Sequence, residues 1–126
     1  MDTSALIAFL DRSDSFHTQY RRLFADPPPL ATSALVIAEG HGWFLRRYDA
    51  ARAIQFLSFV SALEDLTILP FDSDALYQAS RTIRKFADQK LTLADAHGLA
   101  IMTARRTRVC WSTDRHMGLT GVALAV

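Results

Sequence analysis

Apolar residues recur every three or four positions along most of the chain, which is the spacing of one face of an α-helix. A side chain that can cap a helix stands ahead of several of these apolar stripes. The predicted helices begin at Ser13, at Thr32 or Ser33, at Asp49, at Asp72 and at Thr92, and end near residues 24, 46, 63, 86 and 105. A shorter apolar stretch at residues 5–10 predicts one more helix near the start of the chain.

Short β-prone runs separate these helices. They lie at residues 66–70, 108–112 and 122–126, and residues 30–32 add a candidate edge strand. Apolar runs that alternate with helices are typical of parallel strands buried on both faces. The predicted fold is therefore α/β, a three-layer arrangement in which helices cover both faces of a parallel sheet of about four to five strands.

Composition and charge narrow the class of protein. The 126 residues carry 14 Lys and Arg against 13 Asp and Glu, a net charge of +1, so no overall basic field attracts nucleic acid. The one cysteine, Cys110, cannot form an intrachain disulfide and fits a reducing compartment. No apolar run is long enough to span a bilayer, and no signal-peptide pattern opens the chain. These features predict a single cytoplasmic domain over residues 1–126.

Four acidic residues stand where α/β proteins carry functional groups, at helix starts and beyond the carboxyl ends of strands. Asp2 precedes the first predicted helix, and Asp95 lies in the first turn of the last one. Asp114 follows the predicted strand at 108–112. Glu39 lies within a helix that is apolar nearly all round, where a lone carboxylate requires a partner or a function.

Each acid also has a structural explanation. Asp95 can form a capping box with Thr92, and Asp2 can favour the start of a helix. Asp114 can be an ordinary turn residue, and Glu39 can be half of a buried ion pair with an arginine. The four structural explanations would all have to hold at once, whereas one bound cation accounts for the whole set.

A hard divalent cation is the best match to this set. Carboxylates about 5 Å apart repel by roughly 3 kcal/mol at an effective dielectric constant near 20, and a cation removes that cost. Mg²⁺ binds through a few carboxylates and retained waters, which suits oxygen ligands. Zinc is the alternative, because His41, His97 and His116 each follow an acid by two residues. On a helix such residues point to different faces, so only His116, in a loop, can join its acid.

The four acids lie in four ordered motifs: DTSAL at 2–6, SALVIAE at 33–39, LADA at 93–96 and STDRH at 112–116. These motifs resemble those of PIN-domain ribonucleases, and the short chain resembles the VapC toxins of bacterial toxin–antitoxin pairs. The resemblance implies a five-stranded parallel sheet and an endoribonuclease that depends on Mg²⁺ or Mn²⁺. It also implies a cognate antitoxin as partner, and we expect a homodimer.

The resemblance also assigns residues. It implies an acidic catalytic and metal-binding set made of Asp2, Glu39, Asp95 and Asp114. Neighbouring hydroxyls would hold these carboxylates or the metal's waters, with helix capping or turn bonding as the alternative role: Thr3, Ser4, Ser112 and Thr113.

Local basic side chains are the candidates for binding RNA. They are Arg115 beside the acids and a helical face with Arg81, Arg84 and Lys85, for which an ordinary solvated face is the alternative. The alternative function is a catalytically silent PIN-like module that binds RNA or protein without cleaving it. A phosphate-receiving signalling domain fits less well, because the run at 122–126 has no lysine.

The first strand is the point at which the chain departs from the resemblance. Several apolar residues that form a central strand normally precede the first aspartate, but only Met1 precedes Asp2. We therefore expect a first strand that is truncated before Asp2.

One apolar surface is also expected. The helix from Asp49 carries its predicted core stripe at residues 50, 53, 54, 57 and 60, and Phe56 and Phe59 fall outside it. This pattern predicts an outer groove for an antitoxin helix or a second copy of the chain, with a broad core that buries both rings as the alternative.

Overall fold

The computed structural model describes residues 1–125. The helices are α1 (Thr3–Leu10), α2 (His17–Leu23), α3 (Ala34–Arg47), α4 (Ala50–Ala62), α5 (Ser73–Lys85) and α6 (Leu93–Arg105). The strands are β1 (Leu30–Ser33), β2 (Leu66–Leu69), β3 (Val109–Cys110) and β4 (Ala123–Leu124). Two short 3₁₀ helices are η1 (Ala87–Gln89) and η2 (Arg115–Gly118). None of the helices within 1–125 has the length and hydropathy needed to cross a membrane.

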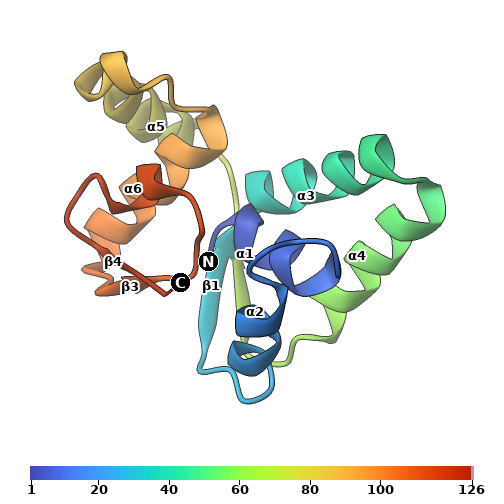
Figure 1. The fold of residues 1–126 in the computed structure, drawn as a ribbon. Coiled ribbons are helices and arrows are strands. Elements are labelled where there is room, and N and C mark those ends of the chain that lie inside the picture. The colour runs from blue at the N-terminus through green and yellow to red at the C-terminus, as the bar shows by residue number, and fades with distance from the viewer. Residues whose placement is uncertain (126) are drawn as a thin grey trace.

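The strands pair in parallel, which confirms the predicted α/β class. β1 pairs with β2, and β3 pairs with β4, so the four strands lie in two parallel pairs and not in one continuous sheet. Figure 1 shows α1 to α4 gathered around the first pair and α6 beside the second pair, with α5 packed outside α6. The predicted strand at 122–126 is shorter than expected, and Val126 lies outside the described residues.

The main chain of Met1 and Asp2 lies between the two strand pairs. The amino group of Met1 donates to the carbonyl of Ala31 in β1 at 2.8 Å, and the amide of Asp2 donates to the carbonyl of Trp111, just after β3, at 2.9 Å. A cavity of about 380 Å³ beside them is lined by residues of β1 and β3. Met1 and Asp2 thus connect both halves of the fold. A truncated first strand stays a prediction.

Side-chain caps form most helix starts where the sequence predicts them. Ser33, Asp49 and Asp72 each accept a hydrogen bond from the amide three residues later. The start of α2 was predicted wrongly at Ser13. The carboxylate of Asp11 instead accepts from both the amide and the hydroxyl of Ser13, which holds that segment in a turn.

The predicted outer groove on α4 is wrong. Phe56 is fully buried, and Phe59 stacks on Phe9 with ring centroids 4.7 Å apart. Ile54 and Leu57, which were predicted in the core stripe, are 61% and 40% exposed. The helix is therefore rotated so that its large aromatic rings enter the core, because rings bury more apolar area than the aliphatic side chains opposite them.

Gly40 allows α3 and α4 to approach closely, and this contact gives a first stability prediction. A Cβ atom on Gly40 would collide with the ring of Phe56 in the core. We expect Gly40→Ala to lower the free energy of unfolding by about 1–3 kcal/mol through overpacking. Gly42→Ala is the matched control, since its Cβ would meet only the mobile guanidinium of Arg46. Urea unfolding measures both, and equal stabilities would show that Phe56 can move aside.

Candidate metal centre

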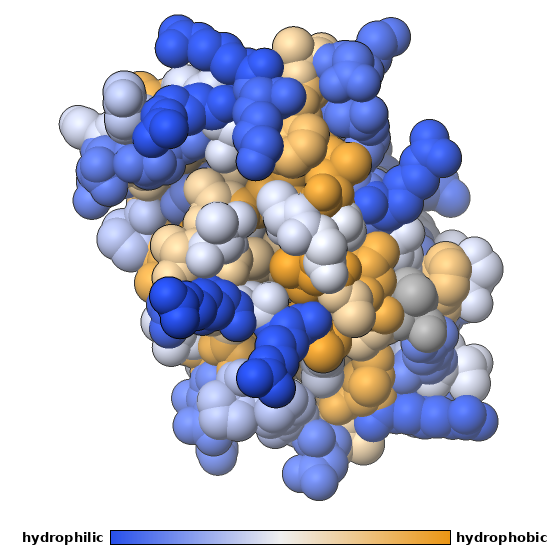
Figure 2. Space-filling view, turned by 90° about the vertical axis from the view of Figure 1, so that its left-hand side faces the viewer, coloured by the Kyte–Doolittle hydropathy of each residue, from blue (hydrophilic) through white to orange (hydrophobic). Residues whose placement is uncertain are grey.

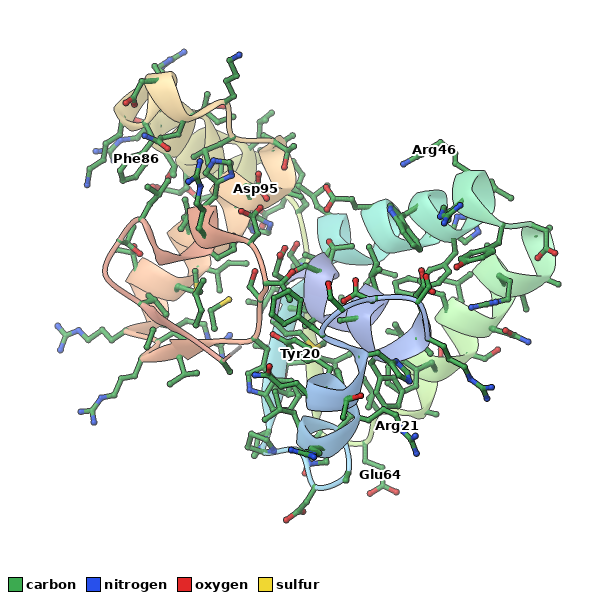
Figure 3. All side chains as sticks on the ribbon, viewed as in Figure 1. Tyr20, Arg21, Arg46, Glu64, Phe86 and Asp95 are labelled. Carbon is green, nitrogen blue, oxygen red and sulfur yellow. The ribbon has the colours of Figure 1, made fainter. Side chains whose placement is uncertain are left out.

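Four elements that are distant in sequence bring the predicted acids together. Asp2 precedes α1, Glu39 lies in the middle of α3, Asp95 lies in the first turn of α6, and Asp114 caps η2. α3 packs against both α1 and α6, and η2 packs against α6. Figure 3 shows Asp95 at the N-terminal end of α6, on the side that faces α1 and α3. The charges of Asp2, Asp95 and Asp114 all raise the pKa of Glu39, so the four acids form one electrostatic cluster.

Hydroxyl groups hold Asp2 in this cluster. Its side chain is 6% exposed, and its Oδ2 accepts from Ser4 Oγ at 2.8 Å and from Ser112 Oγ at 2.9 Å. Ser112 Oγ in turn accepts from the amide of Asp114 at 2.9 Å, and Ser4 Oγ accepts from the amide of Thr113 at 2.9 Å. The first and last motifs of the chain are thereby joined into one hydrogen-bonded unit.

Asp95 has a structural role as well as a place in the cluster. It forms the predicted capping box, in which its Oδ2 accepts from the Thr92 amide and its own amide donates to the Thr92 hydroxyl, both at 3.1 Å. Burial raises the pKa of Asp95, and the charges of Asp2 and Asp114 raise it further. The capping bond uses only one carboxylate oxygen, so the other is available to a cation.

Glu39 has no basic partner to explain its burial. Within residues 1–125, the one contact of a carboxylate with a basic side chain at salt-bridge distance joins Asp114 to His116, so the predicted alternative of a Glu39–Arg pair is not found. Burial raises the pKa of Glu39 most, and the neighbouring carboxylates add to it. The Thr3 hydroxyl beside Glu39 opposes this shift, yet it is buried without a hydrogen bond of good geometry. An unpartnered hydroxyl among like charges fits a hydrated cation, and the residues present therefore suit a divalent metal.

His116 lies beside two of these acids, although it was not among the predicted site residues. A carboxylate oxygen of Asp95, a carboxylate oxygen of Asp114 and a ring nitrogen of His116 all lie within 4.8 Å of one another. The expectation that His116 alone among the acid-adjacent histidines reaches the acids is confirmed. His97 is instead buried against the ring of Phe71, with centroids 5.0 Å apart. The sequence feature that could have identified His116 as a site residue is its place in a predicted loop, two residues after Asp114.

A second prediction follows from the raised pKa of Glu39. A carboxyl group whose pKa is raised on folding contributes stability below its unfolded pKa and loses it as the pH rises through the folded value. Metal-free Glu39→Gln should therefore be at least as stable as the wild type at pH 7.5, and it should lose this advantage as the pH falls through the folded pKa toward the unfolded value of about 4.3. Thermal melts across this range measure the difference. A loss of several kcal/mol at pH 7.5, with and without Mg²⁺, would instead indicate a buried charge pair.

The predicted RNA-binding side chains lie on the surface. Arg115 is exposed in η2 next to Asp114, and Arg81, Arg84 and Lys85 are exposed on α5. The guanidinium of Arg81 lies 5.9 Å from the centre of the Tyr77 ring. Figure 2 shows the face of the molecule that carries α5 and α6, where hydrophilic side chains surround apolar surface.

Comparison with known proteins gives a family and a structural relative. The sequence profile of the PIN domain matches residues 1–121. A crystal structure of VapC20 from Mycobacterium tuberculosis, described as a sarcin-ricin loop cleaving toxin, superposes with a TM-score of 0.86 at 21% identity. That match covers 97% of this chain and 94% of VapC20. No curated protein matches the chain.

Proposed function

Because this chain belongs to the PIN domain family, we propose that it is a metal-dependent endoribonuclease and the toxin of a toxin–antitoxin pair. The observation that carries the proposal is that the charges of Asp2, Asp95 and Asp114 all act on Glu39, which has no arginine or lysine partner within residues 1–125. The structural likeness to VapC20, a toxin that cleaves RNA of the sarcin-ricin loop, supports the same activity.

The four carboxylates are the proposed metal ligands, either directly or through water. Their oxygen atoms suit Mg²⁺, and Mn²⁺ accepts the same ligands. When bound, a divalent ion neutralises charge on the phosphate and lowers the pKa of a water. The Ser4 and Ser112 hydroxyls orient Asp2, while the capping box orients Asp95, so both carboxylates are fixed before substrate arrives.

Glu39 is the proposed proton acceptor of the reaction. Glu39 has no arginine or lysine partner within residues 1–125, so its carboxylate is free to accept a proton from the attacking water. In the proposed step, water attacks the phosphorus atom and its proton passes to Glu39. The phosphorus–oxygen bond to the leaving nucleotide breaks on the opposite side, and the leaving oxygen takes a proton from solvent water.

RNA would be held by local basic groups, because the whole chain carries a net charge of only +1. Arg115 is the proposed contact to the phosphate nearest the acids, and Arg81 and Arg84 are the proposed contacts further along the strand. A single-stranded or loop segment fits best, since its splayed backbone can enter a recessed site. Binding should weaken as salt concentration rises, because each phosphate contact releases counterions.

Two partners belong to the same proposal. A cognate antitoxin is expected to neutralise the nuclease, and a second copy of the chain is expected to form a homodimer. The antitoxin follows from the resemblance to VapC toxins, whereas the homodimer is a separate expectation.

Incubation of the purified protein with end-labelled RNA tests the proposed function. Mg²⁺ or Mn²⁺ should support internal cleavage of a single-stranded or stem-loop substrate, and EDTA should stop it. Arg115→Ala should raise KM more than it lowers kcat, since Arg115 is exposed and contacts substrate only. RNA binding without cleavage in any divalent ion would favour the catalytically silent module.

A further inference from the structure

We propose that His116 is a metal ligand together with Asp95 and Asp114, and that this nitrogen donor makes the centre select Mn²⁺ over Mg²⁺. The inference rests on the proposed function, since it concerns the same metal. It adds a ligand that the four-acid motif does not contain, and it predicts which ion the centre prefers.

The atoms of His116 and Asp114 already have the spacing of neighbouring ligands. His116 Nδ1 lies 3.3 Å from Asp114 Oδ1. Neighbouring ligands of a six-coordinate ion with bonds of about 2.1 Å lie roughly 3 Å apart. A carboxylate oxygen of Asp95 completes a group whose members all lie within 4.8 Å of one another. Three side chains from two elements thus place one oxygen or nitrogen atom each within 4.8 Å of one another.

The fold fixes His116 in this position. The carboxylate of Asp114 caps η2 by accepting from the His116 amide at 2.9 Å. Met117, the next residue, is buried and packs against α6 at Gly98, where a Cβ atom would lie 2.7 Å from its terminal methyl. Gly98 is less than one helical turn from Asp95. Packing of η2 on α6 therefore sets the distance between His116 and Asp95.

A simple hydrogen bond between His116 and Asp114 is the alternative explanation. Such a hydrogen bond explains the position of Asp114 only. Asp95 would still have no positive partner, even though the negative charge of Asp114 acts on it. The side chains of His116 and Asp114 are also 28% and 35% exposed, so both are accessible from solvent. A shared cation explains all three side chains together.

The chemistry of the donors determines the choice of ion. Mg²⁺ is a hard ion that takes oxygen ligands almost exclusively, whereas first-row transition ions accept imidazole nitrogen readily. Carboxylates remain the majority of the ligands here, and Mn²⁺ favours carboxylates and water more than do the transition ions that prefer imidazole or thiolate ligands. A mixed set of carboxylates and one imidazole therefore discriminates against Mg²⁺.

Mn²⁺ provides a direct test, because its electron paramagnetic resonance signal reports both binding and directly attached nitrogen. Wild-type protein should show ¹⁴N coupling in the pulsed spectrum. His116→Ala should lose this coupling and bind Mn²⁺ roughly tenfold or more weakly, with Mg²⁺ affinity from competition nearly unchanged. His116→Asp should bind Mn²⁺ without ¹⁴N coupling and shift the preference toward Mg²⁺. His41→Ala, which changes an imidazole on α3 outside the three-residue group, should behave as wild type.

Two results would overturn the inference: ¹⁴N coupling absent from the wild type, or retained in both His116 variants. His116→Asp keeps the test decisive if His116→Ala fails to fold. Failure of the proposed function is distinguishable, because a wild-type protein that binds neither Mn²⁺ nor Mg²⁺ would remove the metal itself. RNA cleavage by a Mn²⁺-loaded wild type without ¹⁴N coupling would remove only the role of His116.

Discussion

Replacing Asp95 with asparagine is expected to abolish metal-dependent RNA cleavage, a loss of about a thousandfold or more, or ~4 kcal/mol of transition-state stabilisation. The fold should persist, because an asparagine side-chain oxygen can still accept from the Thr92 amide in the capping box. The substitution also removes repulsion between Asp95 and the charges of Asp2 and Asp114. Metal-free Asp95→Asn should therefore melt at or above the wild-type temperature.

Asp74→Asn is the matched control for this experiment. Asp74 lies in the first turn of α5, as Asp95 lies in the first turn of α6, but it is exposed and outside the acidic cluster. Its variant should cleave RNA at the wild-type rate. Cleavage at that same rate by Asp95→Asn would show that Asp95 serves the helix cap alone.

Ser112→Ala should lower metal affinity or cleavage by about 10- to 100-fold without changing any proposed ligand. Ser112 is fully buried, and its hydroxyl both donates to Asp2 and accepts from the Asp114 amide. Its loss leaves that amide without its partner, which should cost about 1–3 kcal/mol of stability. Calorimetric Mn²⁺ titration and urea unfolding measure the two effects separately.

Thr113→Val is the control for Ser112→Ala. Thr113 is the next residue, and within residues 1–125 its side chain makes none of the hydrogen bonds that hold Asp2. The valine variant should keep wild-type metal affinity. If Ser112→Ala loses stability but retains full metal affinity, the Ser112 hydroxyl is structural and does not position the carboxylates.

Local signals explain why most helices could be predicted. A cap such as Asp49 or Asp72 acts on amides three residues away, so the interaction is contained in the sequence around it. The rotation of α4 could not be predicted in this way. Both of its faces are apolar, and only packing against Gly40 and Phe44 selects the face with Phe56.

The acidic cluster was predictable in composition but not in geometry. Ordered motifs pointed to Asp2, Glu39, Asp95 and Asp114, and in the structure the charges of the other three act on Glu39. Which hydroxyl holds which carboxylate depends on contacts between residues far apart in sequence. The same is true of His116, whose distance to Asp95 is set by the packing of η2 on α6.

Strand lengths also depended on distant partners. The run at 108–112 forms a strand only at Val109–Cys110, because only these residues pair with β4. Trp111 and Ser112 beyond it bond instead to Asp2. A polar contact to the first residues of the chain thus ends the strand where the functional site begins.

The bond between Ser112 and Asp2 has a consequence for the order in which the protein becomes active during its synthesis. It joins residues 110 positions apart, and closing a loop of that length costs about 4 kcal/mol of chain entropy. A ribosome releases the N-terminal segments first, so Asp2 and Glu39 emerge long before Ser112 and Asp114. The nascent chain therefore lacks a complete acidic centre until its last motif has been made. Each copy of the protein therefore acquires its acidic centre only at the end of its own synthesis.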